Sequence, residues 1–144
     1  MTDGKAGRLD EIIASHSRRE GPLLPILHDI QAEMGYISED AKRRIAQALN
    51  LSRAEVHGVV SFYHDFRSEP HSKPVLKLCR AEACKARGVE SLVAEATAAA
   101  GERVDIETIY CLGLCSVGPN AMIGKTVHAR LDTPKLTALI KELA

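Results

Sequence analysis

Residues 74–84 read P-V-L-K-L-C-R-A-E-A-C, and residues 104–119 read V-D-I-E-T-I-Y-C-L-G-L-C-S-V-G-P. In both stretches an apolar run with the alternation of a β-strand leads directly into a pair of cysteines. The four cysteines of the chain are Cys79, Cys84, Cys111 and Cys115. Strands that are neighbours in one sheet deliver both pairs to the same edge. The two stretches therefore predict a site of four thiols at the end of a sheet.

Four thiolates can form disulfides, bind zinc or bind an iron–sulfur cluster. Disulfides require an oxidising compartment, and the N-terminal residues M-T-D-G-K-A-G-R-L-D lack the apolar core of a signal peptide. We therefore expect a cytoplasmic protein with reduced cysteines. The spacings C-x4-C and C-x3-C lie at the wide end of zinc clips, whereas a [2Fe-2S] cluster takes two thiolates on each iron. Spacing alone leaves zinc and the cluster equally open.

The second cysteine loop also contains two glycines, Gly113 and Gly118. Glycine lets the backbone approach closely, so that N–H groups reach the anionic bridging sulfides of an iron–sulfur cluster. The alternative is that both glycines only form turns, which is the default use of this residue. The loop sequence leaves the two interpretations equally open.

The segments L-K-L-C-R-A-E-A-C and Y-C-L-G-L-C-S-V-G-P-N-A-M-I resemble the thioredoxin-like [2Fe-2S] ferredoxin family. That family includes the small, 24 kDa-type subunits of NADH dehydrogenase modules, NAD-linked hydrogenases and NAD-dependent formate dehydrogenases. Upstream, L-P-I-L-H-D-I-Q-A-E-M-G-Y-I and L-S-R-A-E-V-H-G-V-V-S-F-Y are similar to the helical region of these subunits, so the resemblance spans residues 20–142. It implies that one [2Fe-2S] cluster is ligated by Cys79, Cys84, Cys111 and Cys115.

Within the family, C-R-A-E-A-C and C-L-G-L-C-S-V-G-P look most like the gamma subunit of the cytoplasmic, molybdenum-containing, NAD-dependent formate dehydrogenase. Respiratory members tend to carry Ala-Pro where this chain has Gly118-Pro119. The resemblance implies a non-catalytic electron-transfer subunit whose cluster exchanges electrons with the FMN of an NADH-binding partner. FMN, NAD and the molybdenum cofactor then belong to partner subunits. The alternative is the equivalent subunit of respiratory NADH dehydrogenase or of an NAD-reducing hydrogenase.

Two functions of other classes remain open. One is a zinc-stapled structural adaptor, in which the four thiolates only hold the fold together. The other is a thiol redox protein, in which one cysteine pair cycles between dithiol and disulfide. Thioredoxin-like folds often carry a cis-proline near the position of Pro119, but a trans turn proline is commoner in general. The sequence leaves the isomer of Pro119 open.

The composition excludes several classes of function. The 19 basic and 19 acidic residues give zero net charge, so no basic surface is available for nucleic acid. No run approaches the roughly 18–20 apolar residues of a membrane span, so we expect no membrane insertion. Near the first cysteine pair, Arg80, Lys85 and Arg87 either offset a negative cluster, contact a partner or form a solvated face. We interpret six scattered histidines as surface or packing residues: His16, His28, His57, His64, His71 and His128.

We expect an α+β chain in three parts. Residues 1–66 form a small helical bundle, which we interpret as a docking domain. Residues 67–74 (R-S-E-P-H-S-K-P) are polar and contain two prolines, so they predict a linker. Residues 75–144 form a thioredoxin-like α/β domain that carries the cysteines.

Apolar spacing and capping signals predict the first two helices. One spans residues 9–17. The next has Pro22 and Pro25 in its first turn, where a missing N–H costs little, and ends at Gly35.

Two further helices follow in the first part. The third opens at Ser38, has an apolar stripe that includes Ala48, and ends at Asn50. The fourth opens with the capping box S-R-A-E at residues 52–55 and runs through Phe62. Short helices such as these are marginal alone, so they must pack on one another.

The second part alternates strands and helices. In chain order we expect a strand in 74–78, a helix in 89–100, a strand in 104–110 and a hairpin in 121–131. A right-handed crossover makes the first two strands parallel. The last helix opens with Thr133 as N-cap and Pro134 at the first helical position. This order favours a thioredoxin-like sheet.

Overall fold

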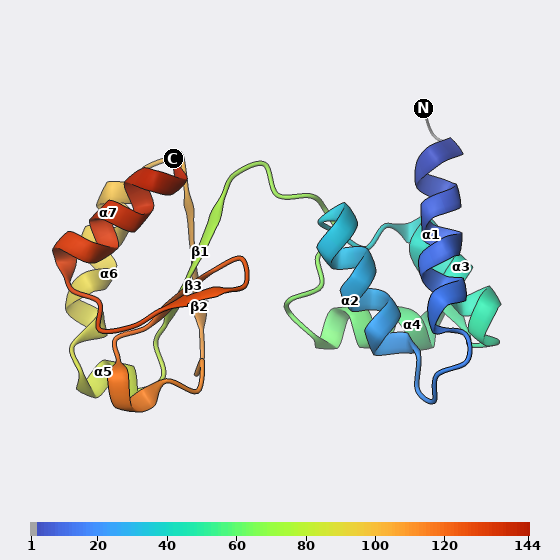
Figure 1. Cartoon of the computed structure of the whole chain (residues 1–144), viewed down its shortest axis with the longest axis horizontal. Coiled ribbons are helices and arrows are strands. Elements are labelled where there is room, and N and C mark those ends of the chain that lie inside the picture. The colour runs from blue at the N-terminus through green and yellow to red at the C-terminus, as the bar shows by residue number, and fades with distance from the viewer. Residues whose placement is uncertain (1–2) are drawn as a thin grey trace. The chain divides into compact units, whose positions relative to one another are not determined.

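The computed structural model describes residues 3–144, and helices precede a sheet along the chain (Figure 1). The chain forms two compact units, of which the first ends at His71 and the second begins at Ser72. The α+β class expected from the sequence is confirmed. The predicted helical domain begins at residue 1, and residues 1 and 2 lie outside the described residues.

The boundary between the two units falls within residues 67–74, which contain no helix or strand. The first residue of this segment is still held by the helical unit. The backbone N–H of Arg67 donates to Gln31 Oε1 at 2.9 Å, and its carbonyl accepts the N–H of Ile37 at 2.7 Å. The segment therefore leaves the helical unit after Arg67.

Four helices make up the first unit: α1 (Asp3–His16), α2 (Leu23–Met34), α3 (Glu39–Leu49) and α4 (Arg53–Phe62). Helix α1 packs against α2 and α3, and α3 packs against α4. Aliphatic side chains fill the centre of this unit, and the largest fully buried ones are Ile26, Leu27, Ile30, Ile37, Ile45 and Val56. Burial of these side chains, rather than helix propensity, stabilises such short helices.

The predicted capping signals are present. Ser38 caps α3 by accepting the N–H of Ala41 at 3.1 Å. At α4, Ser52 accepts the N–H of Glu55 at 3.1 Å while the Glu55 carboxylate accepts the N–H of Ser52 at 2.8 Å, which is a complete capping box. Gly35 ends α2 in the left-handed conformation, with φ of 81°.

Two predictions for the helical unit are wrong. Helix α1 begins at Asp3 rather than at residue 9. The additional residues carry no apolar spacing that would predict a helix. One of them, Arg8, donates a hydrogen bond to Glu33 Oε2 of α2 at 3.0 Å, which helps to stabilise this part of the helix. Ala48 is exposed, because the buried stripe of α3 runs at i, i+4 spacing from Ala41 and residue 48 falls beside it.

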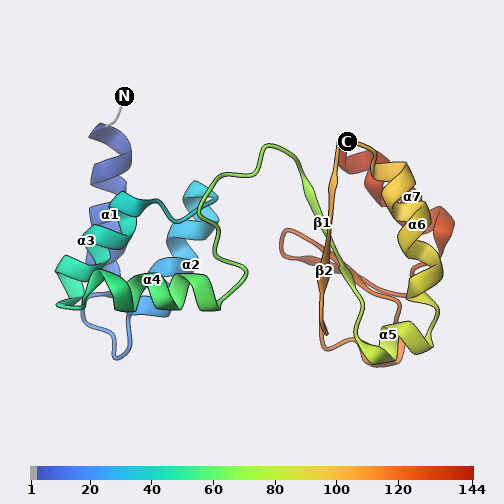
Figure 2. The ribbon, with the colours of Figure 1, turned by 180° about the vertical axis from the view of Figure 1, so that it is seen from behind.

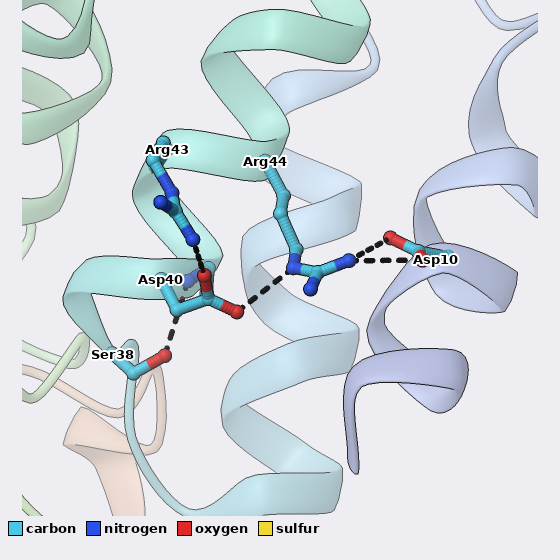
Figure 3. Close-up of polar contacts among 6 residues, drawn as sticks. Asp10, Ser38, Asp40, Arg43 and Arg44 are labelled. Atoms are coloured by element: carbon cyan, nitrogen blue, oxygen red, sulfur yellow. Dashed lines mark hydrogen bonds and ion pairs between the residues drawn. The ribbon is translucent and has the colours of Figure 1, made fainter. Parts of the chain in front are cut away.

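Charged side chains tie α3 to α1 (Figure 3). Arg44 Nε donates to Asp40 Oδ2 at 2.8 Å, and Arg44 Nη1 lies 3.0 Å from both carboxylate oxygens of Asp10. Arg43 also donates to Asp40. The hydrogen bonds from Arg44 and Arg43 hold the pKa of Asp40 below its ordinary value. Asp40 therefore stabilises the folded state most when it is ionised.

Replacing Asp40 by Asn should lower the free energy of unfolding by about 0.5–1 kcal/mol at pH 7, since exposed pairs are worth little. A carboxyl with a depressed folded-state pKa contributes stability above its unfolded pKa and loses it as the pH falls through the folded value. The difference between wild type and variant should therefore narrow toward acid pH. Urea unfolding followed by circular dichroism at several pH values measures it.

Glu20→Gln is the matched control, because it removes the same charge from an exposed position with no ion pair to the described residues. A wild-type minus Asp40→Asn difference that is constant with pH would contradict this account of the ion pairs.

The second unit is a mixed four-stranded sheet with helices packed on it (Figures 1 and 2). Its strands are β1 (Val75–Cys79), β2 (Asp105–Ile109), β3 (Ala121–Ile123) and β4 (Thr126–His128), in the order β2-β1-β3-β4. Strand β2 is parallel to β1, whereas β3 is antiparallel to β1 and β4 is antiparallel to β3. The predicted parallel pairing of the first two strands is confirmed.

The helices of the second unit are α5 (Glu82–Ala86), α6 (Val89–Ala100), α7 (Thr133–Leu143) and a 3-10 turn, η1 (Cys115–Val117). Helices α6 and α7 lie side by side, and both views place them along the sheet (Figures 1 and 2). Their apolar faces bury Leu76 and Leu78 of β1 together with Ala121 of β3. The core of this unit therefore lies between the sheet and the two helices.

Two local expectations for the second unit are corrected, and one helix was missed. Asp132, not Thr133, caps α7, because the Asp132 carboxylate accepts the N–H of Lys135 at 2.9 Å. The second hairpin strand ends at His128, and the chain then turns at Arg130, whose φ is +51°. Helix α5 was not predicted, since five residues are too few for an apolar period.

Candidate metal centre

The parallel pairing of β1 and β2 brings the two cysteine pairs together. Cys79 is the last residue of β1 and is paired in register with Ile109, two residues before Cys111. The backbone N–H of Cys111 points at the Cys79 sulfur, 3.4 Å away. Cys84 lies inside α5, and Cys115 opens η1. The structure therefore collects all four predicted residues at one end of the sheet.

The two pairs differ in their exposure to solvent. Cys79 and Cys84 are each 1% exposed, whereas Cys111 and Cys115 are exposed. All four are free thiols. One pair therefore lies in the core of the second unit, and the other faces solvent.

The backbone conformation at Cys111 sets the orientation of the second pair, Cys111 and Cys115. Cys111 has a φ of +74°, a left-handed conformation that costs about 1 kcal/mol or more for a residue other than glycine. The turn continues through Gly113, also left-handed, whose N–H donates to the Cys111 sulfur at 3.3 Å. The strained turn therefore brings the N–H of Gly113 close to the thiol of Cys111. The N–H of Gly113 thus reaches a cysteine sulfur, and its expected contact with a bridging sulfide stays a prediction.

The environment shifts the pKa values of three thiols. Burial raises the pKa of Cys79, but hydrogen bonds from the backbone N–H groups of Ala81 and Cys111 and from the Cys84 thiol outweigh it, and the net pKa is lowered. Burial raises the pKa of Cys84, and the neighbouring sulfur of Cys79 adds to this. For Cys115, the hydrogen bond and negative charge of Cys111 raise the pKa. Each pair therefore contains thiols that interact with one another.

The spacing of the sulfurs tests which metal centre fits. Cys111 Sγ and Cys115 Sγ are 3.7 Å apart, which matches the edge of about 3.8 Å expected for two thiolates bound tetrahedrally at about 2.3 Å. Within residues 3–144, no three His, Cys, Asp or Glu side chains converge enough to hold one metal ion. The Cys111–Cys115 pair is therefore spaced to bind one tetrahedral metal position, a distance that zinc and an iron of a [2Fe-2S] cluster share.

Asn120 also belongs to this site, and sequence reasoning missed it. It is buried next to Cys84, with its side-chain nitrogen 3.7 Å from the Cys84 sulfur. The signal in the sequence was a polar residue directly after Gly118-Pro119 and directly before the apolar strand β3. The Gly118–Pro119 peptide bond is cis, which settles the open isomer of that proline.

The basic residues near the first pair have different partners. Arg80 forms two hydrogen bonds with Glu90, at 2.9 Å and 2.6 Å, so its charge is matched. Lys85 lies 3.4 Å from Glu82. The aliphatic stem of Arg87 lies against Gly118.

Among residues 3–144, no helix is long and apolar enough to cross a membrane. A sheet that ends in four free thiols, with N–H groups aimed at sulfur, defines a class of protein that holds a metal centre through cysteine at a sheet edge. The family model described as "Thioredoxin-like [2Fe-2S] ferredoxin" matches residues 9–144, and the chain belongs to this family. The thioredoxin-like fold and the cofactor class expected from the sequence are thereby confirmed.

Curated relatives match along most of their length. The NADP-reducing hydrogenase subunit HndA of Solidesulfovibrio fructosivorans is 28% identical, over 92% of this chain and 82% of the relative. An NADH-quinone oxidoreductase subunit of Rhizobium meliloti (strain 1021) is 29% identical, over 92% of this chain and 86% of the relative. Both are described by their names as subunits of oxidoreductases.

Other relatives contain this module within a longer chain. The NAD-reducing hydrogenase HoxS subunit alpha of Cupriavidus necator is 30% identical over 94% of this chain, which corresponds to 24% of the relative. The crystal structure of an NAD+-reducing [NiFe]-hydrogenase in the H2-reduced state matches with a TM-score of 0.71 and 25% identity. That match covers 84% of this chain and 22% of the hydrogenase chain, so this chain spans about a fifth of its length.

Gly118 packs so closely on the first pair that a side chain changes the site. A Cβ at position 118 meets the Cys84 sulfur and Arg87 Cδ at 3.1 Å each, although the backbone, with φ of −65°, allows any residue. Gly118→Ala should therefore displace the Cys84 sulfur by a few tenths of an ångström. The expected result is an altered visible absorption and circular dichroism spectrum of the metal-loaded protein, with stability lowered by less than about 1 kcal/mol.

Gly88→Ala is the matched control, because Gly88 has a φ of +90° and open space around it. That variant should lose about 1 kcal/mol of stability through backbone strain with the spectrum unchanged. Identical spectra for wild type and Gly118→Ala would contradict the inferred contact with the metal ligand.

Proposed function

We propose that this chain is the [2Fe-2S] electron-transfer subunit of an NAD-linked oxidoreductase complex, of the type found in NADH dehydrogenase and hydrogenase modules. The observation that carries the proposal is the meeting of two thiol pairs at the end of β1 and β2, in a member of the [2Fe-2S] ferredoxin family. The relatives named as subunits of NADH-quinone oxidoreductase and of NAD- or NADP-linked hydrogenases support the parent class.

The proposed ligands are Cys79, Cys84, Cys111 and Cys115. When bound, the cluster supplies one-electron chemistry. The chain holds it through the four thiolates, excludes water from the first pair by burial, and directs backbone N–H groups to the sulfurs of Cys79 and Cys111. Donors of this kind set the potential of an iron–sulfur centre. In this proposal the chain transfers electrons only, and the reactions of NAD take place in the partner subunit.

Metal analysis tests the ligand assignment. The full chain, purified without oxygen, should contain two irons and two acid-labile sulfides, with a spin-half electron paramagnetic resonance signal after dithionite reduction. Replacing any of the four cysteines by Ser should remove most of the iron, because a thiolate ligand is lost. Ser116→Ala, in the same loop, is the control and should retain the cluster.

One zinc per chain without sulfide would overturn the proposal in favour of the structural adaptor. Full iron content in a Cys→Ser variant would remove that cysteine from the ligand set. A metal-free chain whose thiols cycle to a disulfide under mild oxidation would point to the dithiol redox protein.

The finer proposal concerns the parent complex. We keep formate dehydrogenase as a candidate, supported by the loop segments C-R-A-E-A-C and C-L-G-L-C-S-V-G-P. We rank NADH dehydrogenase and NAD(P)-linked hydrogenase modules ahead of it as candidate parent complexes, because relatives named as subunits of these enzymes match most of the chain. In each case the partner subunit binds FMN and NAD. A molybdenum-containing, formate-oxidising subunit belongs to the formate dehydrogenase case alone. We place the complex in the cytoplasm, where free thiols persist.

The helical unit offers a surface for the flavin-binding subunit. At the end of α4, Phe62 is 74% exposed and Tyr63 is 43% exposed. They border a groove of about 610 Å³, which we call the Phe62 groove; its other lining residues are Leu23, Leu51, Glu55, Gly58 and Val59. Large exposed apolar side chains beside a groove are typical of protein interfaces. In the longer relatives this module is covalently joined to further sequence, which favours a permanent partner.

Isolation of the native complex through a tag on this chain tests both points. The wild type should retain an FMN-containing partner, and molybdenum in the complex distinguishes formate dehydrogenase from the other two parents. Phe62→Asp should reduce the recovered partner at least tenfold, because a charge is placed in an apolar interface. Val127→Asp, at an apolar position 46% exposed in the second unit, is the control. Equal recovery from the two variants would exclude the Phe62 groove as the docking surface.

A further inference from the structure

Asn120 connects the two cysteine pairs through three contacts. It is 1% exposed and stands directly before β3. Its backbone carbonyl accepts the N–H of Cys79 at 2.9 Å. Its side-chain Nδ2 donates to the carbonyl of Leu114 at 2.7 Å and lies 3.7 Å from the Cys84 sulfur. One residue therefore touches the first pair twice and the second cysteine loop once.

The orientation of the Asn120 amide follows from its neighbours. The Leu114 carbonyl is an acceptor, and so is the Cys84 sulfur as a thiolate. The N–H groups must therefore face them, because the opposite orientation places an oxygen against two acceptors. Oδ1 is then buried without a partner among the described residues. An unpaired buried acceptor is unfavourable, and an apolar side chain of the same size avoids that cost. The contacts of the two N–H groups with the Leu114 carbonyl and the Cys84 sulfur offset that cost.

We propose that Asn120 is a positioning residue of the metal centre, holding the second cysteine loop against the first pair and donating a hydrogen bond to the Cys84 sulfur. The bond to Leu114 fixes the loop, whose Val117 N–H donates to the same carbonyl at 3.1 Å. The N–H near Cys84 stabilises the reduced state more than the oxidised state, because reduction adds negative charge at the sulfurs. This inference rests on the proposed [2Fe-2S] function.

The loop has a second anchor that does not involve Asn120. The N–H of Arg130 donates to the Val117 carbonyl at 2.7 Å, and the N–H of Leu131 donates to the Pro119 carbonyl at 3.0 Å. These bonds hold the end of the loop near Pro119 in place when the Asn120 side chain is changed. A loss of order in an Asn120 variant should therefore be concentrated between Cys111 and Val117.

The first test is a redox titration of the cluster-loaded full chain, followed by visible absorption. Asn120→Leu keeps the side-chain size and removes the side-chain donor, while the backbone N–H of Asn120 that also interacts with Cys84 stays in place. At the wild-type midpoint potential, its ratio of reduced to oxidised protein should fall about three- to tenfold, less than the full worth of a hydrogen bond to a charged group, because the bond exists in both oxidation states and only its difference shifts the ratio. In Asn120→Asp, which also adds a negative charge, this ratio of reduced to oxidised protein should fall further. Ile140→Val, in the same core on α7, should reduce thermal stability without moving the midpoint.

The second test needs no metal. In the metal-free full chain, amide hydrogen exchange at Cys111 and Val117 should be about tenfold faster in Asn120→Leu than in wild type, because the loop has lost its anchor. In Ile140→Val these amides should exchange at the wild-type rate. The exchange experiment remains decisive where a variant does not load the cluster.

The outcomes separate the two proposals. A wild-type chain that binds no iron, but whose loop exchanges faster in Asn120→Leu, contradicts the electron-transfer function and supports the positioning role. A loaded Asn120→Leu variant with the wild-type midpoint and unchanged exchange overturns the positioning role and leaves the function intact. Equal loop exchange in Asn120→Leu and Ile140→Val also overturns it.

Discussion

The parallel pairing of β1 with β2 is the constraint on which the metal site depends. Burial of Leu76 and Leu78 against α6 and α7 fixes which face of β1 points inward, and a slip of one residue would turn both outward. With that register fixed, Cys79 ends one strand beside the point where the chain turns into Cys111. The apolar core thus determines where the thiols lie, although it provides none of the chemistry.

The two cysteine pairs have different surroundings for a topological reason. β1 is an interior strand with neighbours on both sides, so Cys79 at its end is covered, and α5 folds back to bury Cys84. β2 is an edge strand, so the loop that follows it stays exposed with Cys111 and Cys115. Strand order therefore sets which thiols meet solvent, and exposure is one determinant of the potential of such a centre.

The sequence predicted what is encoded locally. The capping box beginning at Ser52 and the turn at Gly35 depend on a few adjacent residues, and the structure contains both. Strand alternation and cysteine spacing placed the site at a sheet edge. Helix α5 was missed because tertiary packing stabilises its five residues. Asn120 was missed because its contact with Cys84 spans 36 positions of sequence, and no local pattern encodes such a contact.

The four thiols themselves cannot distinguish one parent complex from another, so we look to the residues around them. Four cysteines are what a [2Fe-2S] ligand set requires in any member of the family, so they carry no information about the partner. Gly118 and Asn120 stand on either side of Pro119, and both lie against Cys84. The second cysteine loop therefore acts on the first pair through this G-P-N segment. An Ala in place of Gly118 would therefore change the surroundings of the Cys84 sulfur without changing the four cysteines.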